Sequence, residues 1–439
     1  MKRKNAACAV SAVLVATFAT LGAAPPAAAA NTGEYSVVNL GSFGGVYGQA
    51  SSINDIGTIA GAADPAGDAV TQAAWFGRSG PFDLGALGGP ASNSAIAWPN
   101  HDNFPLLAGV SETSEVEPLG EYWSCEIFFY TPATQHVCVG FVEQNGAMKA
   151  LPTLGGYDGY AAGTNDFGQV VGWAETAYHD PTCEGQGVGF GQVLQFLPAV
   201  WNPPYRTAEA LPTLPGDSDG DATAVNDRGV VVGNSGQCDQ AVGRFTAQHV
   251  VMRDHGKPIN IPYAATLGGA AWNTPTDVSN TGEIVGFANL RGNATGNLAP
   301  HAFLWTATGG MKDMLTLPGD SNSGASGVND FGEVVGYSGS RAFVYRNGTM
   351  TDLNSLVDAS GASLYLLAAN DVNDRGEIVG QACVLQAGKC LATSSLVAFV
   401  ARPHRPGPHP YARSRSLAQA VVVPASVLAR VMRRYTGTL

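Results

Sequence analysis

A nine-residue pattern returns along most of this chain. It reads TNDFGQVVG at 164–172, VNDRGVVVG at 225–233, VNDFGEVVG at 328–336 and VNDRGEIVG at 372–380. With a degenerate copy, WPNHDNFPLLAG at 98–109, the glycine that ends the pattern falls at positions 61, 109, 172, 233, 286, 336 and 380. Self-similarity at such spacing indicates a repeat architecture in which each copy is one supersecondary unit. The chain therefore holds seven repeats.

The pattern itself predicts a tight β-hairpin. An apolar residue ends the first strand, Asn and Asp bond their own backbone in the turn, and the next glycine takes positive φ without a Cβ clash. A type I turn followed by a left-handed glycine is a common hairpin closure. We therefore assign a turn-forming role, rather than a catalytic one, to Asn54 and Gly57, Asn165 and Gly168, Asn226 and Gly229, Asn280 and Gly282, Asn329 and Gly332, and Asn373 and Gly376.

Two more strand-like segments follow each hairpin, except at the end of the chain. The third segment is short and aromatic or bulky, as in PAVW at 198–201, HAFLW at 301–305 and VAFV at 397–400. The fourth follows a polar turn, as in MKDMLTLPG at 311–319. Short β-rich runs bounded by Gly, Asn and Asp predict strands, so each repeat is a four-stranded unit.

The last repeat lacks its own fourth strand. After 397–400 the chain continues as ARPHRPGPHP, which we expect not to pair in a sheet. The segment YSVVNLGSFGG at 35–45 precedes the first hairpin and matches the fourth strands. The sequence therefore predicts an all-β fold, a seven-bladed β-propeller of four-stranded blades, closed by the N-terminal strand completing the last blade. The alternative, a linear solenoid, would leave this N-terminal strand unpaired.

The repeat resembles that of the HAF family of extracellular bacterial proteins. The resemblance rests on HAFLW at 301–305, on LGG endings at 154–156 and 267–269, and on the hairpins, and it covers nearly all of 35–401. The His-Ala-Phe triplet occurs once and becomes Arg-Ala-Phe at 341–343 and Val-Ala-Phe at 397–399. The resemblance implies export and repetition, and it brings no catalytic residues and no substrate.

Composition divides the chain into three parts. Residues 1–30 have a basic start, an apolar run and an Ala-Ala-Ala end, as in a secretory signal peptide, so we expect the mature protein to be secreted. The propeller, 31–401, holds 13 basic and 35 acidic residues, a net charge of −22, which disfavours a nucleic-acid partner. The tail, 402–439, is rich in Pro and Arg and is expected to be disordered, without a transmembrane span. It could contact an anionic envelope surface, lie against the acidic propeller, or have no function.

Six cysteines lie outside the expected signal peptide, and an even number in an exported chain favours disulfides. Cys183 and Cys238 follow the second strands of consecutive repeats, so adjacent blades would bring them together. Cys125 with Cys138, and Cys383 with Cys390, each enclose a short hairpin-like segment. We predict these three pairs.

Few residues indicate chemistry. Asp217, Asp219 and Asp221 alternate beside Gly220, a spacing of oxygen ligands found in calcium loops, although the full loop with its glutamate is absent. Calcium is thus the only cofactor considered, with a solvated turn as the alternative. The eight histidines show no metal-ligand spacing, and no nucleophile elbow or phosphate loop occurs.

Long insertions after the second strands, at 110–135 and 173–197, are the more informative feature. They contain aromatic residues that could stack on sugars, anchor a protein partner, or only cover the blade edges: Tyr122, Trp123, Phe128, Phe129, Tyr178 and Phe190. We expect a non-catalytic binding or surface-interaction module for an unknown extracellular glycan or protein. The alternative is a lyase or hydrolase acting on polysaccharide or a small ester at the channel mouth.

Overall fold

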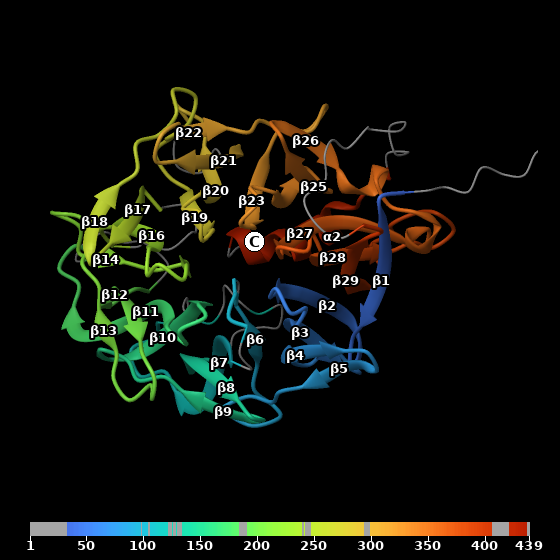
Figure 1. Ribbon diagram of the computed structural model, residues 1–439. Helices are drawn as coiled ribbons and strands as arrows, with labels where there is room; N and C mark the ends of the chain where they lie inside the picture. The colour runs from blue at the N-terminus through green and yellow to red at the C-terminus, as the bar shows by residue number, and fades with distance from the viewer. Residues whose placement is uncertain are drawn as a thin grey trace, which may run out of the picture. The chain divides into compact units, whose positions relative to one another are not determined.

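Seven four-stranded antiparallel sheets follow one another around a ring, which confirms the predicted seven-bladed β-propeller (Figure 1). The computed structural model describes residues 33–97, 99–103, 106–121, 125, 129, 134–183, 191–238, 241, 247–293, 299–405 and 421–436. All of these belong to one unit, Gly33–Leu439. In each blade the first strand is innermost and the fourth is outermost (Figure 1).

The first four blades run as follows. Blade 1 holds β2 (Gly44–Ile53), β3 (Ile59–Pro65), β4 (Gln72–Gly77) and β5 (Gly80–Asp83). Blade 2 holds β6 (Ser94–Ile96), β7 (Leu106–Val116), β8 (His136–Gln144) and β9 (Ala147–Ala150). Blade 3 holds β10 (Gly155–Thr164), β11 (Val170–His179), β12 (Leu194–Trp201) and β13 (Glu209–Ala210). In blade 4 the first strand is split into β14 (Asp219–Gly220) and β15 (Ala224–Val225), followed by β16 (Val231–Gly236), β17 (His249–Asp254) and β18 (Lys257–Asn260).

The last three blades complete the ring. Blade 5 holds β19 (Asn273–Val278), β20 (Ile284–Asn289), β21 (Pro300–Thr306) and β22 (Gly310–Asp313). Blade 6 holds β23 (Ser323–Val328), β24 (Val334–Ser338), β25 (Arg341–Arg346) and β26 (Thr349–Asp352), and two short 3-10 helices, η1 (Leu353–Ser355) and η2 (Ala359–Gly361), lead to blade 7. Blade 7 holds β27 (Leu364–Val372), β28 (Ile378–Val384) and β29 (Leu396–Pro403), and its fourth strand is β1 (Tyr35–Gly41).

Strand β1 closes the ring as predicted. It pairs antiparallel with β29, with Val38 opposite Val400 and Tyr35 opposite Pro403. The expectation that residues after 400 leave the sheet is therefore wrong for Ala401–Pro403, which pair with Val37, Ser36 and Tyr35. Pro403 is tolerated because it is the last residue of its strand.

The two glycines of the hairpin pattern serve different physical purposes. Turn glycines such as Gly376, with φ of 72°, occupy the left-handed region where a Cβ is disfavoured. A methyl group on any of the seven closing glycines would instead lie 1.8–2.1 Å from a backbone carbonyl oxygen of the neighbouring first strand. The first strand carries a register shift beside this point in most blades, as between Ala50 and Ser52. Only glycine fits so close an approach.

The aromatic residue of the third strand packs over the same glycine. Phe303 lies directly opposite Gly286, and Phe399 lies opposite Gly380. Both phenylalanines are fully buried. Phenylalanine faces the closing glycine in blades 2, 5, 6 and 7, whereas Ala74, Ala199 and Val251 face it in blades 1, 3 and 4.

The tail is not wholly disordered, in contrast to the expectation for 402–439. Helix α2 (Ala425–Thr436) begins directly after Pro424, a residue well suited to a helix start. Val427 and Val431, one turn apart, are buried against Tyr337 and Tyr365 of blades 6 and 7. The helix was not predicted from the sequence, because the apolar run was compared only with the length of a membrane span.

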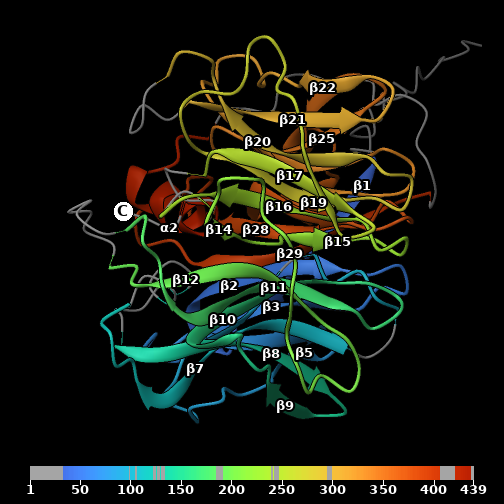
Figure 2. The ribbon, with the colours of Figure 1, turned by 90° about the vertical axis from the view of Figure 1, so that its left-hand side faces the viewer.

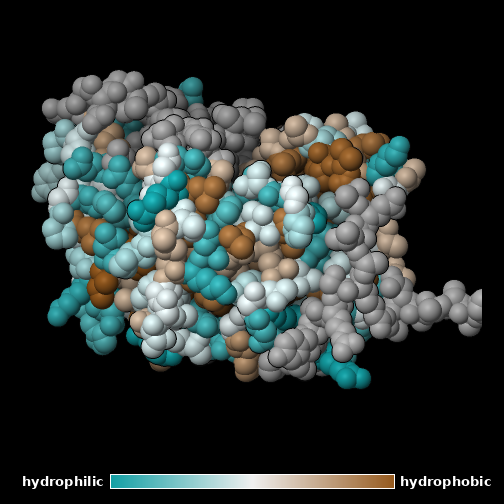
Figure 3. Space-filling view, turned by 90° about the horizontal axis from the view of Figure 1, so that it is seen from above, coloured by the Kyte–Doolittle hydropathy of each residue, from teal (hydrophilic) through white to brown (hydrophobic). Residues whose placement is uncertain are grey.

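The edge of the ring at blades 5 and 6 is largely hydrophilic. Seen from the edge where blades 5 and 6 lie, hydrophilic residues predominate and apolar ones are interspersed (Figure 3). The fourth strands are partly exposed, as in β22 and β18. In the part of the chain that the structure describes, α2 is too short to cross a bilayer and no other helix approaches that length.

Candidate functional site

The ring has two faces of different construction (Figure 2). We call the face where the first and second strands of each blade are joined the turn face. We call the opposite face, where the second and third strands are joined and where α2 packs, the loop face. The predicted turn residues lie at the turn face, and the six paired cysteines lie at the loop face.

On the turn face the Asn-Asp turns bind one another. The side-chain amide of Asn226 donates to the carbonyl oxygen of Ser279 in the next blade, at 2.8 Å, and its oxygen accepts from two backbone N–H groups of its own turn. The carboxylate of Asp227 accepts from the backbone N–H of Asp166 in the preceding blade, at 2.8 Å. Equivalent bonds join all seven pairs of neighbouring blades, from Asn54 through Asn103, Asn165, Asn226, Asn280, Asn329 and Asn373 back to Asn54. These residues thus connect blades as well as form turns.

One turn residue has a different position from the one assigned by sequence. In blade 5 the backbone N–H of Gly282 donates to Ser279, so Ser279 occupies the place that asparagine has elsewhere. Asn280 takes the place of the aspartate, and its side-chain oxygen accepts from the N–H of Asp227. The repeat pattern was defined by its asparagine, so it did not predict a turn role for Ser279.

The loop face carries all three disulfides, paired as predicted. They join Cys125 to Cys138, Cys183 to Cys238, and Cys383 to Cys390. The first and third close loops within blades 2 and 7, and the second links the loops of blades 3 and 4. The loop face is therefore held by covalent bonds where the turn face is held by hydrogen bonds.

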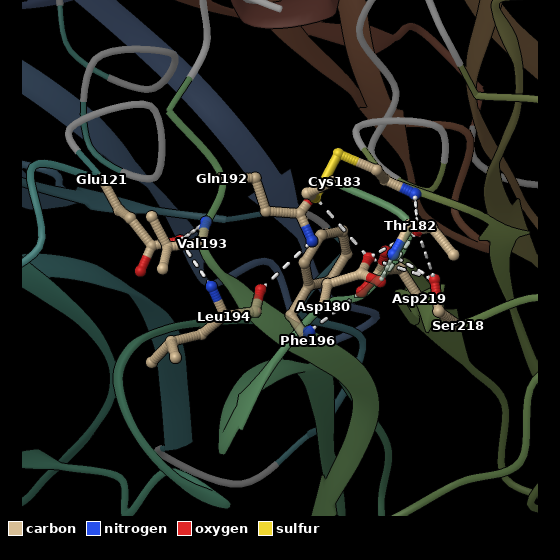
Figure 4. Close-up of a disulfide and its surroundings, with 11 residues drawn as sticks. Glu121, Asp180, Thr182, Cys183, Gln192, Val193, Leu194, Phe196, Ser218 and Asp219 are labelled. Carbon is tan, nitrogen blue, oxygen red and sulfur yellow. Dashed lines mark hydrogen bonds between the residues drawn. A yellow bond between two sulfur atoms is a disulfide. The ribbon is translucent and has the colours of Figure 1, made fainter. Parts of the chain in front are cut away.

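Polar side chains reinforce the links between loops (Figure 4). Glu121, from the long loop of blade 2, is buried and its carboxylate accepts from the backbone N–H groups of Val193 and Leu194 in blade 3. Near the Cys183 disulfide, the hydroxyl of Thr182 accepts from the N–H of Cys238 at 2.8 Å. Loops of blades 2, 3 and 4 are thereby tied into one layer.

Asp180 and Asp219 form a carboxyl pair beside this disulfide (Figure 4). The hydroxyl of Ser218 lies 3.1 Å from an oxygen of each. Burial, with the hydrogen bond to Asp180, raises the pKa of Asp219 to about 9. Burial alone would raise the pKa of Asp180, but hydrogen bonds from Asp219, Thr182 and Ser218 lower it. At neutral pH the pair therefore holds one proton, on Asp219.

The three aspartates considered for calcium have separate partners. Asp217 accepts from the Ser235 hydroxyl at 2.7 Å and lies 3.1 Å from His249 Nδ1. Asp219 also accepts from a backbone N–H of β12 in blade 3.

Asp221 is buried and accepts from the N–H of Asn234 at 2.6 Å. Burial raises its pKa to about 7, although Asn234 and Arg253 act in the opposite direction. Calcium at these three residues stays a prediction, which the melting temperature of chelated protein with and without added calcium would decide.

A cavity opens at the loop face between blades 2 and 3, with a volume of about 440 Å³. We call it the loop-face cavity. Val137, Val139 and Leu151 give it buried apolar walls, and Thr113, Ser114, Glu115 and Thr153 supply hydroxyl and carboxyl groups. Tyr157 stands at its edge with 44% of its surface exposed. Ligand pockets commonly combine such an apolar wall with a few polar groups and have about 300–1,000 Å³.

The aromatic residues singled out in the loops have mixed positions. Tyr178 is exposed, but Phe129 is buried against Cys125 and Cys138 and supports the loop instead of facing a ligand. Tyr122, Trp123, Phe128 and Phe190 lie outside the described residues. Tyr157 was not singled out, because its segment reads as the start of a first strand.

A disulfide-bearing seven-bladed propeller with a cavity on its loop face is the class of protein that these observations define. Residues 215–400 match the model of a protein family of unknown function, DUF3466. This match neither includes nor excludes the HAF resemblance. No curated protein matches the chain.

Several solved structures match this chain at low similarity. A protein of unknown function from Dyadobacter fermentans is 12% identical, with 71% of this chain and 95% of that chain covered and a TM-score of 0.37. A polysaccharide lyase of family PL25, an ulvan lyase, is 10% identical, with 84% and 94% covered and a TM-score of 0.37. The extracellular domain of a two-component system protein from B. thetaiotaomicron is 9% identical, with 83% and 39% covered and a TM-score of 0.38. Similarity at this level carries no argument about function.

Proposed function

We propose that this protein is an exported, non-catalytic binding module that holds a sugar-like ligand in the loop-face cavity. The size of that cavity, about 440 Å³, is the observation that carries the proposal. A space of this volume accommodates one or two sugar rings, whereas the cavity at the turn-face end of the channel measures about 40 Å³ and admits only a few water molecules. The two cavity volumes thus favour ligand binding at the loop face over polysaccharide cleavage at the turn-face end of the channel.

The lining favours a hydroxyl-rich ligand without negative charge. Tyr157 can stack on the apolar face of a sugar ring, and Thr113, Ser114 and Thr153 can exchange hydrogen bonds with its hydroxyls. Glu115 would repel an acidic sugar, as would the net charge of −22 over residues 31–401. A neutral or amine-bearing glycan fits these groups.

A disulfide supports the cavity wall. Val137 and Val139 flank Cys138, whose disulfide to Cys125 fixes the start of β8. Preorganisation lowers the ordering cost of binding. Disulfides that use all six cysteines outside residues 1–30 also support export.

Retention of the purified full chain on insoluble glycans tests the proposal. Chitosan and xylan serve as amine-bearing and neutral probes, and polygalacturonate as the acidic one. We expect retention on at least one of the first two, and a tenfold or greater loss with Tyr157→Ala. Tyr178→Ala is the matched control, because Tyr178 is an exposed tyrosine of the same face that does not line the cavity.

Unchanged retention of Tyr157→Ala would move the ligand away from this cavity. Release of reducing ends or unsaturated products from any probe would overturn the non-catalytic reading and support a lyase or hydrolase. Fractionation of the producing cells into medium, envelope and cytoplasm tests export.

A further inference from the structure

The degenerate turn of blade 2 places a histidine inside the channel, near the turn face. His101 Nε2 lies 3.5 Å from Asp371 Oδ1 in blade 7 and 3.7 Å from Asp277 Oδ2 in blade 5. Oxygen and nitrogen atoms of all three side chains lie within 4.8 Å of one another. Three blades far apart in sequence therefore direct potential ligand atoms at one point.

The two aspartates are alike in position and orientation. Each is the residue before the last in its first strand, beside a register shift. Asp277 Oδ2 accepts from the N–H of Val328, and Asp371 Oδ1 accepts from the N–H of Val372, each at 2.8 Å. One backbone bond to each oxygen fixes the carboxylate and leaves its other lone pair available.

Space for the second carboxylate depends on a glycine in blade 6. A Cβ on Gly327 would lie 2.9 Å from Asp371 Oδ1. Gly327 has the strand position that Asp371 and Asp277 have in their own blades. Blade 6 thus makes room for the carboxylate of blade 7.

The distances do not describe direct hydrogen bonds. At 3.5 and 3.7 Å the separations exceed the usual 2.7–3.2 Å, and the buried His101 Nε2 has no hydrogen-bond partner among the residues that the structure describes. Two ligands bound at about 2.0–2.1 Å to one tetrahedral ion lie roughly 3.4 Å apart. The histidine nitrogen is therefore spaced from each carboxylate oxygen like a neighbouring ligand of a metal ion, and all three atoms lie within 4.8 Å of one another.

We propose that His101, Asp277 and Asp371 bind one divalent transition-metal ion, with zinc as the simplest case. An imidazole nitrogen disfavours calcium and magnesium, which take oxygen ligands, and suits zinc and its neighbours. Both carboxylates are fully buried, so a divalent ion balances charges that a neutral histidine leaves uncompensated. The adjoining cavity of about 40 Å³ has room for a water as fourth ligand, and Asp55, Asp330 and Asp374 line it.

The competing state is a metal-free ion pair. Burial alone lowers the pKa of His101, but the carboxylates of Asp277 and Asp371 raise it to about 10, with a contribution from Asp55. A protonated His101 would then neutralise one of the two charges. Zinc must displace this proton, so binding should weaken as pH falls.

Metal content and affinity of the full chain distinguish the two states. After EDTA treatment and gel filtration, we expect the protein to take up one zinc ion per chain, measured by mass spectrometry of the metal and by competition with a chromogenic chelator. His101→Ala should weaken this binding at least tenfold. His301→Ala is the matched control, since His301 lies 3.0 Å from one carboxylate, Asp313, outside the channel.

Two further measurements keep the proposal falsifiable if His101→Ala folds poorly. Asp371→Asn should weaken zinc binding without removing the histidine, and circular dichroism reports whether each variant is folded. Cobalt added to the wild type should give the visible absorption of a tetrahedral site, which Asp371→Asn loses. No stoichiometric uptake by the wild type, or equal uptake by folded His101→Ala and wild type, would overturn the metal site and leave the ion pair.

Discussion

Neighbouring blades are held together on both faces of the ring, but the interactions differ between the two faces. On the turn face, short and mostly similar turns bind one another through Asn and Asp side chains at every blade junction. On the loop face, connections of unequal length are tied by disulfides and by buried carboxylates such as Glu121. Where the connecting turns are alike, the same hydrogen bonds can join each pair of blades. Loops of unequal length need a different link at each junction. The loop face is therefore free to differ between blades, which a binding surface requires.

Removal of the disulfide between blades 3 and 4 should have the largest effect on stability. The bond closes a segment of 55 residues, and the loop-entropy model gives about 4 kcal/mol for such a length. We expect Cys183→Ser with Cys238→Ser to lower the free energy of unfolding by about this amount, measured by denaturant titration.

The matched control removes Cys383 and Cys390, which enclose only seven residues of separation. The same model gives about 2.5 kcal/mol for that loop. If the two double variants lose equal stability, the link between blades is no more important than a link within one blade.

A single asparagine of the turn face should come next. Asn226→Ala removes a bond to blade 5 and two bonds within its own turn, in a buried position. Leaving these groups unsatisfied should cost about 2–3 kcal/mol, again measured by denaturant titration. Arg228→Ala, an exposed residue of the same turn, should change stability by less than about 0.5 kcal/mol. Equal losses for the two variants would show that the inter-blade bonds on the turn face are unimportant.

The last prediction concerns the direction of a pH dependence of stability on the loop face. The pKa of Asp219 is raised to about 9 in the folded protein, against 3.8 without burial. Between these values the folded state binds the extra proton, so the stability that it contributes is complete below pH 4 and declines as pH rises toward 9. The pKa of Asp180 is lowered, so Asp180 changes the stability with pH only below pH 3.8, outside this pH range. Asp219→Asn stays uncharged, so its melting temperature should fall less than that of the wild type between pH 5 and pH 9.

A parallel decline of the two melting temperatures would contradict the shared proton between Asp180 and Asp219. It would also remove one reason for treating the loop-face layer of blades 2 to 4 as a coupled unit.

Much of the scaffold could be predicted because its signals are local. The closing glycine, as in Gly380, recurs in all seven repeats, and the turn with Asn373 and Gly376 recurs in most of them. Each reports a short-range requirement. The count of fourth strands predicted the closure by β1, and the place of Cys183 and Cys238 in successive repeats predicted their disulfide. Helix α2 was not predicted, because the tail was assessed by its Pro and Arg content and not by the spacing of its apolar residues.

The candidate sites were less accessible to sequence reasoning. The loop-face cavity combines side chains of blade 2 with Tyr157 of blade 3, and no spacing along the chain connects them. The three alternating aspartates, by contrast, have a suggestive spacing, yet Asp217 and Asp221 bond to different neighbours. The cavity lining thus has no signal in sequence spacing, and calcium at the three aspartates stays a prediction.

The sequence by itself determined how the blades are built, because strand alternation, turn chemistry and the need for glycine act over a few residues. Only the tertiary structure decided that His101 of the one degenerate turn meets Asp277 and Asp371. Ring closure brings opposite blades to a common axis, and side chains separated by hundreds of residues can then lie a few ångströms apart. Such contacts depend on closure of the whole ring, and no short segment of the sequence predicts them.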